Sequence, residues 1–500
     1  MQRSTLIILS FLLPATLFVS CNKLNESPQS GIVASQFYKT AADATAAVSA
    51  VYSTLNSDPA ADFPIYGRDL NLLTGNGSDD QVYAPSNTNP DVRALGTTTY
   101  VAANDRVRKV WQQHYYGISR ANVAIDNIAG MSIDTTLRSR LVREAKFIRA
   151  LLYFNIVRFW GDAPLILHDP TTVAVNSLKT GRSPKDSIYG QILSDLSDAV
   201  NLPATYSGAN IGRATSGAAH ALLAKVYVTR RDWTDALTEL RQVITAGTFA
   251  GTTGAYGYDL FPKFLDVFQQ ATKNGKEHVF SVQFGTNLGA VNSTQSLSGT
   301  AFNSFNTSVY PGDIPADSTL WNLFDPADTR RSVTFYTSIY NATTGKTVVY
   351  PGAPRFAKFI DFSLSPLTSQ GISGINYPVI RYAEILLLYA ETLNEINGGP
   401  TADAYAAINK VRSRANVAEL TAGLGQSDFR DSIFLERRKE FIQEGQRWFD
   451  LVRRGGSYLY DALKKIPAKT GAALKDTLYP IPQTEIDLVG ATILTQNGGW

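Results

Sequence analysis

The residue types that catalysis uses most often are sparse and scattered in this chain. Asp79 and Asp80 are adjacent carboxylates, which could serve general acid–base hydrolysis. However, adjacent residues in a loop point apart, whereas a hydrolase needs two facing carboxylates from separate segments. The sequence contains no Gly-x-Ser-x-Gly, His-Glu-x-x-His, P-loop or Gly-x-Gly-x-x-Gly motif. It therefore favours a protein that is not an enzyme, with a surface hydrolase using Asp79 or Asp80 and a loop acid as the alternative.

Metal ligands are equally sparse. The histidines stand singly, and we expect them to be packed or surface residues: His114, His168, His220 and His278. One acidic loop could hold Ca²⁺ through oxygen ligands; its carboxylates are Asp313, Asp317, Asp325 and Asp328. Their spacing matches no EF-hand, and a solvated loop is the favoured interpretation. We therefore expect no cofactor and no metal, with Ca²⁺ at this loop left open.

Composition narrows the class of protein further. The chain has 500 residues, with 46 Lys and Arg against 43 Asp and Glu, a net charge of +3. This balance disfavours a nucleic-acid-binding protein, which normally carries a concentrated basic face. A mean hydropathy of −0.10 excludes a polytopic membrane protein. A chain of this length is expected to form two or more domains, or one extended repeat array.

The first 20 residues have the pattern of a secretion signal. Arg3 precedes an apolar run over residues 6–19 that is too short to span a bilayer comfortably. Cys21, the single cysteine of the chain, follows directly after Ser20 and resembles the acylated cysteine of a bacterial lipobox. We expect residues 1–20 to be a lipoprotein signal peptide and residues 21–36 a lipidated tether. The alternative is an ordinary secretory signal with an incidental cysteine.

Helical periodicity dominates the rest of the chain. Residues 137–159 carry two apolar rows, which predicts a helix that packs against neighbours on more than one side. Gly161 and Pro164 should end this helix. The same periodicity predicts helices at about 37–56, 104–129, 185–200, 215–230, 233–246, 381–396, 402–416 and 428–453.

Two stretches look like helix pairs of one kind. Residues 221–227 and 233–237 flank a short turn, as do residues 386–391 and 404–408. Small residues beside Tyr, a turn and an Ala-bearing amphipathic helix are typical of tetratricopeptide-like repeats, in which small residues let paired helices approach closely. Such an array is a scaffold that presents a surface.

The helical pattern fails in two segments. Residues 57–100 and 247–378 are rich in Gly, Ser, Thr, Asn and Pro and are predicted to be loop-rich. Short β-like runs occur within the second segment, at 278–284, 333–336 and 356–360. Long irregular segments in a compact protein usually carry function, so we expect both to contribute to ligand binding.

Several ordered blocks of residues closely resemble the hallmarks of the SusD/RagB family. They are Glu144–Phe154 with Phe159–Leu165, Arg381–Glu391, Glu436–Phe441, Gly445–Leu451, and Tyr479–Pro482 with Leu494–Asn497. They occur in the family's order from about residue 37 to the end, so residues 37–500 are predicted to form one SusD-like domain. The charged hallmark residues lie within helix patterns, and we expect interhelical ion pairs from Glu144, Arg149, Glu384, Glu391, Arg412, Arg437 and Glu440.

The resemblance implies a fold and a role. The fold would be mostly α, with tetratricopeptide-like helix pairs supporting an irregular ligand-binding half. The protein would be a Bacteroidetes outer-membrane lipoprotein that faces the exterior and sits as a lid on a SusC-like TonB-dependent β-barrel transporter. It would capture oligosaccharides, or peptides as some members do, without catalysis. A purely structural lid, whose transporter partner does all the recognition, is a further alternative.

Glycan binding needs aromatic faces for the sugar ring and polar groups for its hydroxyls. These groups should come from loops, because aromatics at helical spacing are normally core. The candidates are Tyr66, Asn71, Asp79, Asp80, Tyr83, Tyr310, Trp321 and Tyr377. We expect Trp321 to be the leading contact; the alternative is a local mini-core in which it packs with Leu320, Leu323 and Phe324.

Overall fold

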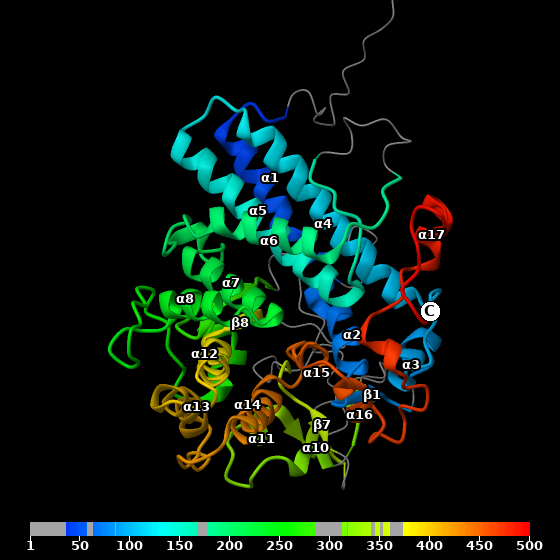
Figure 1. Cartoon of the computed structure of the whole chain (residues 1–500), viewed down its shortest axis with the longest axis vertical. Helices are drawn as coiled ribbons and strands as arrows, with labels where there is room; N and C mark the ends of the chain where they lie inside the picture. Colours follow the sequence, from blue (N-terminus) through cyan, green and yellow to red (C-terminus); the bar gives the residue numbers. More distant parts are fainter. Residues whose placement is uncertain are drawn as a thin grey trace, which may run out of the picture.

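The described part of the chain is mostly helical. The computed structural model describes residues 37–57, 64–85, 87–168, 179–285, 313–317, 319–341, 346–350, 354–360 and 374–500. Within these residues the strands are short and lie in two-stranded sheets (Figure 1). The predicted fold class, mostly α with a few short strands, is confirmed. The predicted signal peptide and tether lie outside the described residues.

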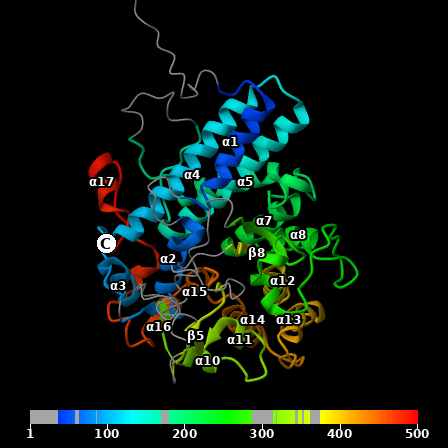
Figure 2. The same ribbon diagram turned by 180° about the vertical axis from the view of Figure 1, so that it is seen from behind.

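Long helices form one end of the molecule. Three of them lie side by side in both views (Figures 1 and 2), and a fourth packs against the third; they are α1 (Ala41–Ser53), α4 (Asp105–Ala129), α5 (Thr135–Trp160) and α6 (Lys185–Ala199). Asn104 and Asp134 cap α4 and α5, since their side chains accept backbone N–H bonds from the first turn. Gly161, at a φ of 71°, ends α5 where the sequence predicted.

The predicted helix pairs are confirmed. They are α7 (Ser216–Arg230) with α8 (Trp233–Val243), and α12 (Tyr382–Ile396) with α13 (Ala402–Arg414). The helices of each pair contact one another, and α8 contacts α12, which joins the two pairs into one stack (Figure 1). Small residues on these helices, among them Ala218, Ala221 and Ala390, are completely buried, which lets the helices approach closely.

One predicted helix is wrong in its extent. Periodicity indicated a single helix over 428–453, but the structure has α14 (Gln426–Phe441) and α15 (Arg447–Arg454). The chain turns between them because Gln443 and Gly445 adopt left-handed φ angles of 66° and 70°. A Cβ at Gly445 would lie 2.9 Å from the nearest side-chain atom, so the turn also needs a glycine for space.

In the residues that the structure describes, the sheets are four antiparallel pairs of short strands. The pairs are β1 (Gln81–Tyr83) with β3 (Asp313–Pro315), β2 (His278–Val282) with β8 (Tyr377–Arg381), β4 (Phe335–Tyr336) with β7 (Arg355–Phe356), and β5 (Ser338–Asn341) with β6 (Lys346–Val349). The predicted β-like runs at 278–284, 333–336 and 356–360 overlap β2, β4 and β7. This pairing joins segments that are far apart in the sequence. For instance, β8 pairs with β2 and is followed directly by α12.

The segment 57–100 is more helical than predicted. Its described residues include the π-helical turn η2 (Ile65–Asp69), α2 (Leu70–Asn76) and α3 (Pro90–Thr97). Leu72 and Leu73 are completely buried, so tertiary packing stabilises a helix that is too short for a clear periodic pattern.

The remaining described elements are short. They are η5 (Gly208–Asn210), η6 (Phe264–Phe268), η7 (Gln270–Thr272), α10 (Thr319–Asn322), α11 (Arg330–Thr334), α16 (Tyr458–Leu463), η9 (Leu474–Thr477) and α17 (Gln483–Val489).

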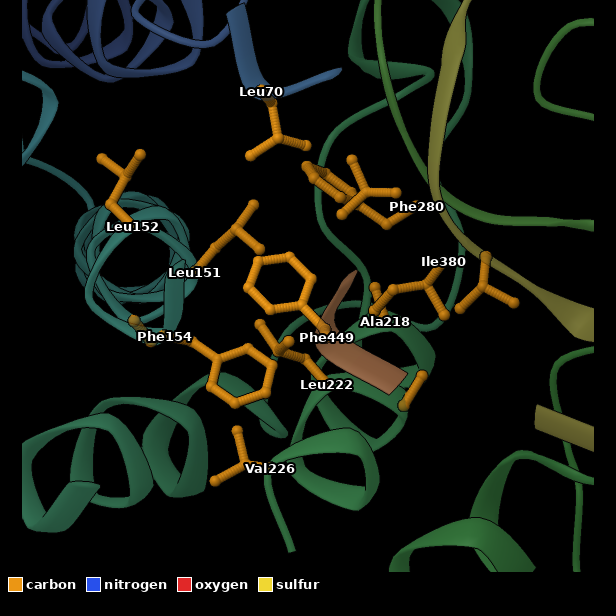
Figure 3. Packing of buried hydrophobic residues seen from close by; sticks show 14 of the residues in the cluster. Leu70, Leu151, Leu152, Phe154, Ala218, Leu222, Val226, Phe280, Ile380 and Phe449 are labelled. Atoms are coloured by element: carbon orange, nitrogen blue, oxygen red, sulfur yellow. The ribbon is translucent and has the colours of Figure 1, made fainter. Parts of the chain in front are cut away.

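A continuous apolar core joins the two halves. One cluster of buried side chains extends from Ala44 to Leu494. Figure 3 shows part of it, where Leu151 and Phe154 of α5 lie close to Phe449 of α15. The core thus brings together residues from early and late in the described chain.

Buried ion pairs tie the elements together. The predicted interhelical role of the hallmark charges is confirmed by the pairs Arg149–Asp195, Glu384–Lys225, Glu391–Arg453, Arg412–Glu436, Arg437–Asp450 and Glu440–Arg414. Glu144 instead pairs with Arg213, which lies in the segment before α7. Burial alone would raise the pKa of Glu440, but Arg414, Arg381 and Arg330 hold it well below its usual value. These charges are structural in the described part of the chain.

Candidate ligand-binding site

Asp79 and Asp80 form buried ion pairs. Their exposed fractions are 6% and 4%. Arg447 donates to both carboxylate oxygens of Asp79, at 2.7 and 2.9 Å, and Arg438 donates to Asp80 at 2.7 Å. Both carboxylates are therefore bound to arginines below the surface, which does not support the prediction that they contact a ligand.

The two carboxylates differ in their electrostatic surroundings. Burial would raise the pKa of Asp79, but Arg447 and then Arg438 hold it well below its usual value. The pKa of Asp80 is raised by burial and by neighbouring Asp79, against the opposing effect of Arg438. Such a difference occurs in acid–base pairs. Here each carboxylate is already bound to an arginine in the interior, which leaves the hydrolase alternative without an exposed acid at this position.

Tyr66, Asn71 and Tyr377 come together inside the molecule. The Tyr377 hydroxyl donates to Asn71 Oδ1 at 3.1 Å, and the rings of Tyr66 and Tyr377 lie 5.4 Å apart. Asn155 donates to the Tyr66 hydroxyl at 3.0 Å. All three predicted residues are buried, and burial raises the pKa of Tyr66 to about 12. This arrangement does not support the prediction that they contact a ligand.

Tyr83 and Trp321 are the predicted aromatics with side chains that are only half-buried in the described residues. Tyr83 ends β1, opposite Asp313 of β3, and the Arg93 guanidinium lies 5.1 Å from its ring centre. Tyr310 lies outside the described residues. Tyr83 and Trp321 therefore remain candidates for a ligand contact from the loop-rich half.

Trp321 lies on a small apolar cluster of its own. Leu320 and Phe324 are buried in this cluster, and Trp321 and Leu323 pack against it. The Arg331 guanidinium covers the Trp321 ring at 3.9 Å. This is the mini-core that the sequence left as the alternative, and it occupies part of the ring surface that a sugar would need. The role of Trp321 in ligand binding stays a prediction.

The acidic loop is organised by an arginine where its residues are described. Arg330 donates to both carboxylate oxygens of Asp328, at 2.9 and 2.8 Å, and Asp325 accepts from the backbone N–H of Ala327. Among the described residues, no group of three or more His, Cys, Asp or Glu side chains could hold a metal ion. Asp328 is therefore already neutralised by Arg330, which disfavours it as a Ca²⁺ ligand.

A groove near the helix pairs combines aromatic and charged groups that the sequence analysis did not select. Its volume is about 340 Å³, and its lining includes Trp233, Glu395, Arg430, Phe434 and Tyr458. Tyr458 has an exposed fraction of 45%, and the Arg454 guanidinium lies 4.1 Å from its ring centre. Trp233 and Tyr458 begin α8 and α16, and Trp233 also packs in part against the main apolar core. No local pattern in the sequence marked these residues, because the groove forms only where several helices meet.

The fold and these surfaces define a class: a helix-pair scaffold that carries an irregular half, with aromatic groups at its surface. Two family models match the chain. The model described as "SusD family" matches residues 334–500, and the one described as "Starch-binding associating with outer membrane" matches residues 65–228. The chain belongs to the SusD/RagB family.

Relatives and solved structures agree with this assignment. SusD-like protein P2 of Formosa agariphila is 27% identical, with 98% of this chain and 99% of the relative covered. A crystal structure of a SusD homologue from Bacteroides thetaiotaomicron superposes with a TM-score of 0.79 at 24% identity, covering 93% and 98% of the two chains. A structure named "Laminarin binding SusD-like protein" gives a TM-score of 0.75 at 26% identity, covering 93% and 100%.

A helix that crosses a membrane must be both long and hydrophobic. Among the helices of the described ranges, none is both long and apolar enough to cross a bilayer.

Proposed function

We propose that this protein is an outer-membrane lipoprotein that binds oligosaccharides and delivers them, without catalysis, to a SusC-like TonB-dependent transporter. The observation that carries the proposal is the similarity, over nearly the whole chain, to a SusD-like protein named for laminarin binding. The description of the family model over residues 65–228, which names starch binding and the outer membrane, supports the same class of ligand and the same location.

Oligosaccharide binding is also physically consistent with the exposed groups. The apolar CH face of a sugar ring packs on an aromatic ring, and guanidinium and carboxylate groups bond its hydroxyls. Tyr458 and Trp233 lie at a groove with Glu395 and Arg430, whereas Trp321 and Tyr83 lie in the loop-rich half. The groove and the two separate rings of the loop-rich half are the candidate contacts for an oligosaccharide.

The function is tested by glycan-array and peptide-library binding with the form that lacks residues 1–21. We expect saccharide binding with no product formed on prolonged incubation. Turnover of the bound saccharide would instead indicate a hydrolase, and peptide binding would indicate a peptide-uptake protein. No binding in either assay would favour a structural lid.

Trp321→Ala should weaken binding of the best oligosaccharide by roughly tenfold to a hundredfold if this ring stacks on a sugar, by analogy with the ~1–3 kcal/mol for aromatic stacking on bases. Calorimetric titration and thermal melting of the same variant separate the two roles of the ring. Weaker binding with an unchanged melting temperature supports a contact between Trp321 and the sugar. A large drop in melting temperature with intact binding assigns Trp321 to the mini-core, where truncation costs about 3–5 kcal/mol of stability.

Tyr458→Ala is the matched variant at the groove between the helix pairs. Its exposed fraction is 45% and its ring lies outside the apolar core, so the substitution should change the melting temperature little. Weaker saccharide binding by this variant, with wild-type affinity in Trp321→Ala, would place the ligand at the groove.

A further inference from the structure

A cavity of about 440 Å³ lies among the helices of the scaffold. Its walls come from α5, α6, α7, α12, α14 and α15 and from the segments that follow them. Asp186, whose side chain is 78% exposed, stands at its outer side, whereas the Lys225 and Arg437 side chains, with exposed fractions of 10% and 2%, form its inner side. The cavity therefore leads from the surface to buried cationic groups.

Positive charge dominates the lining. Seven lysine and arginine side chains contribute to it, against three carboxylates. The two buried carboxylates are already shared between cations. Glu384 pairs with Lys225 at 2.9 Å and with Arg437 at 3.3 Å. Asp450 pairs with Arg437 and with Arg453, each at 2.9 Å. Each of these carboxylates is therefore already bound to two cations of the cavity.

Arg158 is a cation of the inner side for which the described residues provide no carboxylate partner. Its guanidinium lies between the rings of Phe154 and Phe449, 3.8 and 3.6 Å from their centres. It donates to neutral oxygens, the Phe154 carbonyl at 3.0 Å and Asn155 Oδ1 at 2.6 Å. No carboxylate among the described residues forms an ion pair with it. Burial lowers the pKa of Arg158 to about 10, as expected for a cation that lacks a compensating charge.

Arg437 and Lys225 also line the inner side, where Lys225 already donates to Glu384 at 3.1 Å and to Gln446 Oε1 at 3.0 Å. Arg437 Nη1 is buried and has no hydrogen-bond partner in the part of the chain that the structure describes. Burial, opposed by Glu384 and reinforced by Arg158, lowers the pKa of Lys225 to about 8. Buried cations and unpaired donors cost folding free energy unless a partner satisfies them. An anion inside the cavity would supply that partner for Arg158 and for Arg437 Nη1, and it would add a negative charge beside Lys225.

The rest of the lining suits an organic molecule. Tyr189, Val228 and Leu388 provide apolar wall beside the charged groups. The volume lies within the range of about 300–1,000 Å³ that is typical of small-molecule sites. Planar guanidinium groups bind carboxylate, sulfate and phosphate oxygens through paired hydrogen bonds.

We propose that this cavity binds a small molecule bearing a carboxylate, sulfate or phosphate group, whose oxygens are held by Arg158, Arg437 and Lys225. The cavity shares Val228, Arg231 and Arg453 with the groove beside Tyr458, but Arg158, Arg437 and Lys225 do not line that groove. Variants of these three residues therefore test the anion site separately from the proposed oligosaccharide function.

The test is calorimetric titration of the full chain, purified in detergent, with inorganic sulfate, inorganic phosphate, D-glucuronate and D-glucose. We expect binding of at least one of the three anions and none of neutral D-glucose, which matches glucuronate except for its carboxylate. Binding of the inorganic ions alone would identify a free ion as the occupant, and preference for glucuronate would identify an organic acid. Absence of binding by all three anions, or equal binding of glucose and glucuronate, would overturn the proposal.

Variants locate the anion. Arg158→Gln should weaken anion binding at least tenfold, and it leaves no carboxylate without its partner. The control is Arg120→Gln, since Arg120 is an exposed arginine that lies over Tyr116 and donates to its hydroxyl; it should bind as the wild type does. If Arg158→Gln fails to fold, Lys225→Gln serves instead, because an amide can still donate to Glu384. Unchanged affinity in the folded cavity variant would refute the assignment.

Discussion

At the scale of single residues, the sequence identified chemical groups but not their partners. Asp79 and Asp80 were recognised as a notable pair, yet the arginines that bind them lie more than 350 residues further along the chain. Tyr66, Asn71 and Tyr377 were selected from segments that were predicted to be loop-rich, and tertiary packing buries them. Burial and distant ion pairing cannot be read from local spacing, which explains why most of the candidate site was not predictable.

Asp79→Asn should destabilise the protein by about 3–5 kcal/mol, because it removes the carboxylate charge that compensates buried Arg447. The free energy of unfolding, from urea titration followed by circular dichroism, measures the loss. Asp487→Asn is the control, since Asp487 is exposed and accepts from the Gln483 side chain; it should change stability by less than about 0.5 kcal/mol. Equal stability of the two variants would show that the buried pair does not stabilise the fold.

His278→Gln should make stability less dependent on pH between about 6.5 and 4. Burial lowers the pKa of His278 to about 4, against an ordinary value of 6.5. The unfolded chain therefore takes up a proton first as the pH falls, and stability that is fully present above pH 6.5 is lost towards pH 4, by up to about 3 kcal/mol. Glutamine cannot titrate and can still donate to the Val267 carbonyl, which His278 contacts at 3.1 Å.

The measurement for this prediction is the free energy of unfolding of wild type and variant at pH 7, 5.5 and 4.5. The difference between the two proteins should shrink, or reverse in sign, as the pH falls. Parallel pH profiles would mean that His278 does not carry this dependence.

At the scale of elements, periodicity predicted most of the helices because their apolar rows are long and regular. It merged α14 and α15, since the left-handed turn at Gln443 and Gly445 interrupts no apolar row. It also missed α2 and α3, which are seven and eight residues long and depend on packing for their stability. Helix existence was thus predictable where the helix carries its own pattern.

Gly117 sets the separation of two of these elements. A Cβ at Gly117 of α4 would lie 2.5 Å from Leu152 Cδ1 of α5 and 2.9 Å from Thr54 Oγ1. Gly117→Ala should therefore destabilise the protein by about 1–3 kcal/mol through overpacking. Gly190→Ala is the matched control, because Gly190 lies on exposed surface of α6 with nothing within 4 Å of a Cβ; it should stabilise by about 0.5–1 kcal/mol. Thermal melting of both variants decides, and a stabilising Gly117→Ala would contradict this account of the helix contact.

At the scale of the whole molecule, the sequence predicted a scaffold with an irregular half, and the structure adds where surfaces for ligands form. The lining of the cationic cavity comes from several helices and connecting segments between residues 157 and 478, so no local motif could predict it. The groove beside Tyr458 likewise needs α8, α14 and α16 to meet. Such sites are properties of the assembled stack of helix pairs.

The proposed place of the whole protein depends on its N-terminus. Cys21 follows an apolar segment and is the single thiol of the chain, as an acylated lipobox cysteine would be. Several acyl chains hold a protein firmly at a bilayer, whereas removing their attachment point leaves the contacts with a transporter as the remaining link. Cys21→Ala should therefore stay unacylated, and in cells that lack the transporter it should leave the outer-membrane fraction. Mass spectrometry of the N-terminal peptide and immunoblots of membrane fractions, with and without the transporter gene, measure both effects.

With the transporter present, the wild type should co-purify with a large β-barrel in detergent. A Cys21→Ala protein that stays in the outer membrane without any transporter would refute the lipid anchor, and a wild type that recovers no barrel would refute the partnership.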